Sequence, residues 1–385
     1  MKPFHYVIIT LLVLLASCAK EDTVYVSSGD VRVKYHSVKP YAYATLADGS
    51  FVGLWETDTL GNHTVAKLYG DGSIDSVSVS LVDVKGRKYV ADMCVDYNNN
   101  VFIYFCSEVE AQKYCYLLVC LDEKLNVRYH VSTIEDRPMT AFSLGNPLQD
   151  GRFAFFTEDD TGYSLYVIDE QGRYAGDIRI EDDGHLAHAT EFFCTGESIV
   201  IMYQDSNWQT ALDVMTLDGK YINTIHLSPE VNAASNSIKC FGRYFYFLNI
   251  QYSASKNVVI DKYDSRGNLV FESDTIHLDN VTSLNVVNDN MIVTGYDMKF
   301  NKQYYTVENY YGKIARLSNQ DGSVKDSVTV DYDVKIYGVS SDGLKGYNVF
   351  LERKFDYGTD YFNSTKIDNI YIYNTDDLNT IAIQP

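Results

Sequence analysis

Two histidines stand three residues apart in an acidic stretch of the chain, at His185 and His188. Imidazoles at this spacing beside carboxylates could bind a metal ion or act as acid and base. A His-x-x-His pair outside a helix is also typical of a polar loop with exposed histidines. The two residues are therefore catalytic candidates, but no catalytic residue and no metal ion is assigned from the sequence.

Basic side chains recur in the segments that lead into the repeats described below, at Lys88, Arg137 and Lys335. His185 and His188 occupy the corresponding segment of another repeat. If the repeats form a ring, corresponding positions converge on its axis. The five side chains would then line a basic funnel that attracts a carboxylate or sulfate. They are the ligand-binding candidates of the sequence.

Seven cysteines are present, and four of them fall in one repeat: Cys94, Cys106, Cys115 and Cys120. Residues 101–120 are typical of a hairpin whose loop is centred near Glu110, which would place Cys106 opposite Cys115. An exported protein could oxidise such a pair. Cross-strand disulfides are geometrically awkward and buried free cysteines are common, so both states stay open.

Other side chains allow weaker interpretations. Trp55, Trp208 and tyrosine groups such as Tyr310-Tyr311 could stack on sugar rings, although aromatic residues on alternating strands also pack across strands. Pairs of aspartates such as Asp159-Asp160 could bind calcium, but none fits a calcium-binding loop motif. The sequence predicts no cofactor, and a structural calcium ion has no motif to support it.

The first 17 residues combine one Lys, an apolar run and small residues before Cys18. The apolar run from Tyr6 to Ala16 would reach roughly 16 Å as a helix, too short to cross a membrane, so it indicates an export signal. Leu15-Ala16-Ser17-Cys18 resembles the bacterial lipobox, in which the cysteine is acylated and becomes the mature N-terminus. We therefore expect Cys18 to anchor the protein to a lipid bilayer.

The residues after Cys18 indicate the cellular location of the protein. Ala19-Lys20-Glu21-Asp22 resembles the acidic export tag of Bacteroidetes lipoproteins that are displayed on the outer leaflet. We expect an outer-membrane lipoprotein at the cell surface, with the periplasmic face as the alternative. The expected organisation is a signal peptide over 1–17, a lipidated tether with one possible extra strand over 18–38, and a repeat domain over 39–385.

The repeat domain alternates strand-like runs with two kinds of turn. The first turn of each unit falls near Asp48, Asn99, Asp150, Gly196, Phe241, Asp289 and Asp342. The second falls near Gly72, Asn126, Gly172, Gly219, Gly267, Gly322 and Leu378. A period of about 49 residues with four strands per unit predicts an all-β fold, a β-propeller of about seven four-stranded blades, with six or eight as alternatives.

The last unit is expected to supply its own outer strand over 379–383, so closure by the possible strand near Val31 is not required. Repeat shape and leader together resemble the divergent six-to-eight-bladed propeller lipoproteins of Bacteroidetes. That resemblance implies a fold and a cellular location, and it identifies no catalytic residues.

Composition limits the partners. The chain of 385 residues is 46% hydrophobic, which supplies a large core, and its net charge is −20. A surface that negative repels phosphate backbones and argues against nucleic-acid binding. We expect a binding or interaction module for a glycan or an outer-membrane partner protein, more in keeping with the sequence than an enzyme. The alternatives are a lyase or hydrolase acting on an anionic carbohydrate, and a structural platform in an envelope complex.

Overall fold

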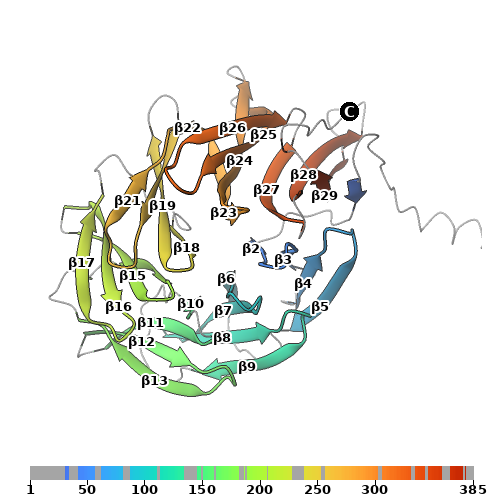
Figure 1. Cartoon of the computed structure of the whole chain (residues 1–385). Helices are drawn as coiled ribbons and strands as arrows, with labels where there is room; N and C mark the ends of the chain where they lie inside the picture. The colour runs from blue at the N-terminus through green and yellow to red at the C-terminus, as the bar shows by residue number, and fades with distance from the viewer. Residues whose placement is uncertain are drawn as a thin grey trace, which may run out of the picture.

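The computed structural model shows a ring of antiparallel sheets arranged around a central axis (Figure 1). It describes residues 31–33, 42–56, 62–80, 87–110, 113–133, 145–148, 151–159, 162–181, 186, 189–205, 207–227, 238–252, 256–301, 306–330, 334–342, 346–357, 365–375 and 378. The described residues form seven sheets, so the predicted all-β propeller of four-stranded blades is confirmed.

The first four blades each consist of four strands that are consecutive in the chain. Blade 1 contains β2 (Ala42–Thr45), β3 (Phe51–Glu56), β4 (Asn62–Leu68) and β5 (Ile74–Ser80). Blade 2 contains β6 (Arg87–Val95), β7 (Val101–Glu110), β8 (Lys113–Leu121) and β9 (Val127–Thr133). Blade 3 contains β10 (Gly145–Pro147), β11 (Phe153–Asp159), β12 (Gly162–Ile168) and β13 (Tyr174–Arg179). Blade 4 contains β14 (Ala189–Cys194), β15 (Ser198–Gln204), β16 (Thr210–Thr216) and β17 (Tyr221–His226).

The remaining blades vary this pattern. Blade 5 contains β18 (Ile238–Phe241), β19 (Tyr244–Tyr252), β20 (Lys256–Tyr263) and β21 (Leu269–Glu272), and the short β22 (Ile276–His277) also pairs with β20. Blade 6 contains β23 (Asn280–Val287), β24 (Asn290–Asn301), β25 (Thr306–Ser318) and β26 (Val324–Val330). Blade 7 contains β27 (Val334–Ser341), β28 (Tyr347–Tyr357), β29 (Thr365–Thr375) and, from the start of the chain, β1 (Val31–Val33).

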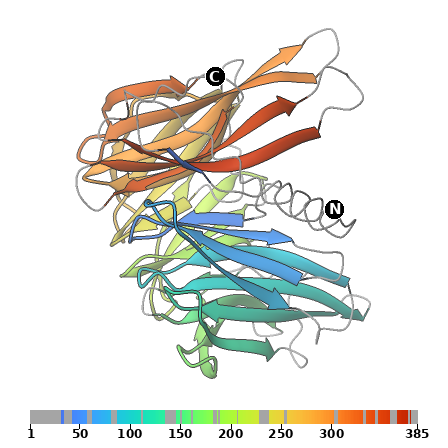
Figure 2. The ribbon, with the colours of Figure 1, turned by 90° about the vertical axis from the view of Figure 1, so that its right-hand side faces the viewer.

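The strands run between two faces of the ring (Figure 2). Because neighbouring strands are antiparallel, the hairpins that join strands one to two and three to four of a blade emerge on one face, which we call the turn face. The hairpins that join strands two to three, and the connections between blades, emerge on the opposite face, which we call the loop face. The long β24–β25 hairpin extends on the loop face.

One turn geometry recurs through the ring. A five-residue turn closes with a backbone hydrogen bond from its first N–H to its fifth carbonyl, and its fourth residue has a positive φ. Glycine tolerates this left-handed backbone, whereas other residues are strained in it. The fourth positions are Gly49, Gly72, Asn99, Leu125, Gly151, Gly172, Trp208, Gly219 and Gly267.

The hydrophobic cores lie between blades. Each of the seven core clusters of the described residues combines side chains from two neighbouring blades. Between blades 7 and 1, for example, the rings of Phe51 and Phe350 stack with centroids 4.9 Å apart. Burial of apolar surface contributes about 25 cal/mol per Å², so each blade depends on both of its neighbours for stability.

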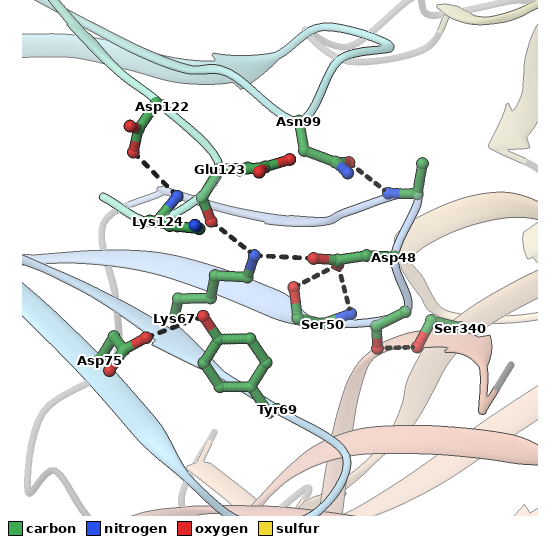
Figure 3. A network of polar contacts seen from close by, with 12 residues as sticks. Asp48, Ser50, Lys67, Tyr69, Asp75, Asn99, Asp122, Glu123, Lys124 and Ser340 are labelled. Carbon is green, nitrogen blue, oxygen red and sulfur yellow. Dashed lines mark hydrogen bonds and ion pairs between the residues drawn. The ribbon is translucent and has the colours of Figure 1, made fainter. Parts of the chain in front are cut away.

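Polar contacts join the same neighbours (Figure 3). The buried ammonium of Lys67 in blade 1 donates to Asp48 Oδ2 and to the carbonyl of Glu123 in blade 2, both at 2.7 Å. Burial alone would raise the pKa of Asp48, but hydrogen bonds from Lys67 and Ser50 outweigh it and hold that pKa below its ordinary value.

The same arrangement recurs in blade 5. Lys262 stands two residues before its turn, as Lys67 does, and is also buried. Its ammonium donates to the carbonyl of Asn319 in blade 6 at 2.8 Å. In both cases a lysine of the third strand satisfies a carbonyl in the turn of the next blade, which fixes the spacing between the two blades.

The ring closes through its N-terminal strand. β1 pairs antiparallel with β29, with Val31 opposite Tyr373 and Val33 opposite Tyr371. The expectation that the last unit supplies the outer strand of blade 7 is therefore wrong, and residues 379–383 lie outside the described residues. Leu378, expected at a turn, lies in a helical turn after β29 and is fully buried in the core between blades 6 and 7.

The hairpin of blade 2 also differs from the sequence-based expectation. Cys106 lies opposite Tyr116, and Cys115 lies opposite Ser107, so the two cysteines do not face each other in the ladder. Glu110 pairs with Lys113, so the loop consists of residues 111 and 112 and is centred beyond the predicted position near Glu110. The register shift between Glu108 and Glu110 recovers only part of this offset, so the two cysteines stay out of register. Cys94 and Cys120 are free thiols, and burial raises the pKa of Cys120 to about 12.

The pairing of β1 predicts the effect of a short truncation. A chain that begins at residue 34 lacks β1, whereas a matched chain that begins at residue 29 retains it. Loss of two to three ladder hydrogen bonds at about 1 kcal/mol each should lower the free energy of unfolding by about 2–3 kcal/mol. Urea denaturation of the two chains measures the difference, and equal midpoints would contradict closure by β1.

Candidate functional site

The structure describes the side chain of one of the five predicted ligand-binding residues, Lys335. Lys335 and Lys88 are each the second residue of the innermost strand of their blades, β27 and β6, near the loop face. The side chain of Lys88 is outside the described residues, as are Arg137, His185 and His188 altogether. Convergence of the five on one funnel therefore stays a prediction.

Lys335 lies in a cluster of charged and aromatic side chains. Its ammonium is 3.6 Å from Glu352 Oε1 on the adjacent strand β28, and its side chain is 15% exposed. The ammonium also lies over two rings of blade 6, 4.3 Å from the centroid of Tyr310 and 5.6 Å from that of Tyr296. Cation–π attraction therefore adds to the ion pair.

The carboxylate of Glu352 is buried and has a second partner. The hydroxyl of Tyr337 donates a hydrogen bond to Glu352 Oε2. Burial and the nearby carboxylate raise the pKa of Tyr337, so the phenol keeps its proton at neutral pH. Tyr43 of blade 1 packs edge-on against Tyr337 with centroids 4.8 Å apart, and its hydroxyl donates to the Thr282 carbonyl of blade 6.

These residues form what we call the tyrosine–lysine cluster: Tyr43, Tyr296, Tyr310, Lys335, Tyr337 and Glu352. Glu352 already balances the charge of Lys335, so an anion gains less attraction here than it would from an unpaired lysine. Glu352 is 2% exposed and its oxygens are taken up by Lys335 and Tyr337. The groups left to meet a ligand are the ammonium of Lys335, a hydrogen-bond donor, and the half-buried rings of the cluster: Tyr43, Tyr296 and Tyr310. This combination suits a ligand that carries hydroxyl groups on an apolar ring.

The sequence indicated two members of this cluster, Lys335 as a ligand-binding candidate and Tyr310 as a residue that could stack on a sugar, and not the other four. Glu352 could have been found, because the turn predicted near Asp342 places it close to Lys335 across the hairpin. Tyr296 and Tyr310 come from blade 6, and no local signal relates them to Lys335.

A separate feature, a cavity, lies on the turn face. Its volume is about 410 Å³, and it is lined by turn residues of blades 2 to 5, among them Tyr97, Arg152, Gly196 and Gly242. Tyr97 of blade 2 reaches blade 5, where its hydroxyl oxygen accepts a hydrogen bond from the Gly242 N–H at 2.6 Å. Burial and the neighbouring Cys240 raise the pKa of Tyr97 to about 12. The side chain thus links two blades that are not adjacent in the ring.

One described carboxyl group, that of Asp261, has a pKa in the range of acid–base chemistry. Burial, together with the charge of Glu272, raises the pKa of Asp261 to about 6, the range of a general acid. Asp261 is 7% exposed on the third strand of blade 5, so its carboxyl group is shielded from a substrate. Within the described ranges no group of three His, Cys, Asp or Glu side chains is placed to hold a metal ion.

The two tryptophans have opposite environments. Trp55 is 3% exposed and belongs to the core between blades 7 and 1, so it is a packing residue and cannot stack on a sugar. Trp208 is 73% exposed at the tip of the β15–β16 hairpin.

Comparison with known proteins supports the fold alone. No family model and no curated protein sequence matches the chain. Among solved structures, the BP39L lectin from Burkholderia pseudomallei is similar with a TM-score of 0.50 and 10% identity, covering 83% of this chain and 94% of the lectin. BamB from Moraxella catarrhalis matches with a TM-score of 0.42 and 14% identity, covering 89% of this chain and 96% of BamB.

A third match is the β-propeller domain of the Trilobed protease from Pyrococcus furiosus, with a TM-score of 0.41 and 13% identity, covering 74% of this chain and 82% of that domain. At these identities the likeness concerns the backbone, and the class of protein is a β-propeller. In the part of the chain that the structure describes, no helix is long and apolar enough to cross a membrane.

The ion pair of the tyrosine–lysine cluster predicts a non-additive pair of substitutions. Lys335→Met leaves the buried Glu352 carboxylate without its cation and should cost about 3 kcal/mol of stability. Adding Glu352→Gln removes the uncompensated charge, so the double variant should be more stable than Lys335→Met alone. Chemical denaturation of both single variants and the double variant gives the coupling energy, and strict additivity would show that the pair contributes nothing.

Proposed function

We propose that this protein is a non-catalytic glycan-binding module whose site lies on the loop face of the propeller. The tyrosine–lysine cluster is the observation that carries the proposal. It offers ring surfaces and hydrogen-bond donors at the inner strand of blade 7.

The charge balance supports a neutral ligand. Lys335 is paired with Glu352, and the whole chain carries a net charge of −20. The negative charge of the chain would repel an anionic glycan. The hydroxyl groups of a neutral glycan bind through hydrogen bonds that do not depend on net charge. We propose contacts at the same face for four more residues, whose side chains lie outside the described part of the structure: Lys88, Arg137, His185 and His188.

We further propose that Cys18 is acylated and anchors the propeller to the outer membrane, facing the cell surface. The lipobox-like residues 15–18 and the acidic segment that follows support this proposal. Position also supports it, because the first described strand begins at Val31 and leaves a short tether between the anchor and the ring.

Glycan binding is tested by calorimetry with neutral oligosaccharides. We expect the full-length chain to bind at least one of a set of glucan, mannan and xylan hexasaccharides. Tyr310→Ala removes one ring of the cluster and should weaken that binding about tenfold or more. Tyr174→Ala, which removes an exposed tyrosine from the outer strand of blade 3, is the matched control and should bind as the parent does.

Three results would contradict the proposal. If the chain binds none of these glycans and specifically captures an outer-membrane protein, it is a protein-binding platform. Cleavage of the oligosaccharides by the parent chain would identify an enzyme. Equal losses for Tyr310→Ala and Tyr174→Ala would place the site elsewhere.

The anchor is tested in cells that express the full-length chain. Growth with radiolabelled palmitate should label the parent protein, and Cys18→Ser should abolish the label and release the protein from the membrane fraction. Protease treatment of intact cells should then degrade the parent protein if it faces outward. Labelling with full protection from protease would support the anchor and exclude display at the cell surface.

A further inference from the structure

A large apolar or aromatic residue is exposed at the same place in five consecutive blades. The place is the first residue of the fourth strand, directly after the hairpin that joins strands three and four, so it lies at the turn face. The five residues are between 36% and 55% exposed. We call them the turn-face rim: Val127, Tyr174, Tyr221, Leu269 and Val324.

A β-bulge follows the rim residue in each of these blades. The pairing register between the third and fourth strands shifts there in all five. In blade 4, for example, the ladder passes from Tyr221 to Asn223, so Ile222 is an extra residue of the fourth strand. Bulges bend a strand and re-aim its side chains, and a bulge that recurs at one position is a feature of the architecture rather than a defect.

Blade 1 shows the same position without a bulge. β4 and β5 pair in one continuous register, and Ile74 at the first position of β5 is half-buried against the core between blades 7 and 1. The ring can therefore shelter an apolar side chain at this position. In the other five blades the bulge accompanies exposure of the side chain instead.

The two tyrosines of the rim also make contacts within their own blades. Tyr174 stacks on Tyr166 with ring centroids 4.6 Å apart. The hydroxyl of Tyr221 lies 3.1 Å from Thr224 Oγ1. About half of the surface of Tyr174 and of Tyr221 nevertheless faces solvent, so both rings can contact a surface laid against this face.

Equivalent positions of a ring lie at one height along its axis, so the rim residues face a common plane. They stand one to a blade, whereas a protein interface buries a contiguous patch of about 800 Å² on each partner. Separate apolar points in one plane suit the boundary between membrane and water, where tyrosine in particular is enriched. The geometry therefore favours a bilayer surface over a protein partner.

The N-terminal strand starts at the same face. β1 is the fourth strand of blade 7, and its first residue, Val31, lies opposite Tyr373 near the turn-face end of β29. Residues 19–30 separate Val31 from Cys18, and a segment of this length spans at most about 45 Å. An acylated Cys18 would thus hold the propeller to a bilayer through a segment that enters at the turn face. At the high effective concentration that a short tether gives, weak contacts are enough to seat the rim.

Charges beside the rim tyrosines are balanced locally. The basic residue directly before each tyrosine pairs with an aspartate of the same turn, Arg173 with Asp169 and Lys220 with Asp218, both at 3.0 Å. These pairs reduce the net charge that the tips of blades 3 and 4 present. Contact with a bilayer of zwitterionic lipids is therefore expected, and no anionic lipid is required.

We propose that the turn-face rim rests on the lipid bilayer in which Cys18 is anchored, with its exposed side chains among the lipid headgroups. The inference rests on the acyl anchor of the proposed function and goes beyond glycan binding. In this orientation the loop face, which carries the tyrosine–lysine cluster, points away from the membrane and stays open to a glycan.

The test places one indole on each face of blade 4 in turn. The first variant, Trp55→Phe with Trp208→Phe and Tyr221→Trp, has its only indole in the rim. The second, Trp55→Phe alone, keeps Trp208 at the loop-face end of the same blade. Each full-length chain is purified in its acylated form from membranes and reconstituted into phosphatidylcholine vesicles whose acyl chains are brominated near the headgroup. The bromine atoms should quench the indole of the first variant and leave that of the second unchanged.

Charge in the rim should undo the contact. Adding Val127→Glu and Leu269→Glu to the first variant places two carboxylates at the bilayer and should abolish most of the quenching, with the protein still membrane-bound. The matched control, Asn207→Glu with Gln209→Glu, adds the same charge at two exposed residues of the loop face and should keep the quenching of the first variant. Neither pair should lower the melting temperature, because all four residues are exposed.

Each outcome supports or overturns the inference. Equal quenching of the two indoles, or quenching of Trp208 alone, shows that the turn face does not rest on the bilayer. Quenching that survives Val127→Glu with Leu269→Glu overturns the role of the rim. Both results leave the anchor standing, because the protein is still bound to the vesicles. An unlabelled parent protein in the palmitate experiment overturns the anchor and the docking together, and the calorimetric test of glycan binding is independent of both.

Discussion

Each sheet of this protein buries its two faces against two different sheets, and the cores lie at the seven contacts between blades. A blade taken alone would expose both apolar faces to water. The complete ring is therefore needed to cover both apolar faces of every blade, and the interface between blades 7 and 1 is needed as much as any other. Phe51 stacked on Phe350 and the pairing of β1 with β29 complete that interface.

Much of the ring could be predicted from local signals. The expected turns near Gly72, Gly172 and Gly219 all lie in hairpins between third and fourth strands. Each has glycine at the fourth position, where this turn geometry requires a left-handed backbone. Gly219 has a second reason to be glycine, since a Cβ there would stand 2.0 Å from the carbonyl oxygen of Arg179 in the preceding blade.

Pairings between distant segments could not be predicted in the same way. The residues of β1 and of 379–383 are both short apolar alternations, and nothing local decides which of them pairs with β29. The register of Cys106 depends on where the hairpin loop is centred and on one irregularity near Glu110, which shifts every pair beyond it. The sequence marks Lys335 as a basic residue of the segment that leads into its repeat. Its aromatic neighbours belong to another blade, so the surroundings of its charge are a property of the assembled ring.

The N-terminal position of β1 has a mechanical consequence. A force applied through the N-terminal segment reaches the propeller at Val31, so it loads the three-residue ladder between β1 and β29 before any other pairing. That ladder is among the shortest in the ring, and it also seals the final blade. A pull on the tether would peel this strand first and open the ring at one seam, while the longer hairpins of the other blades still carry no load.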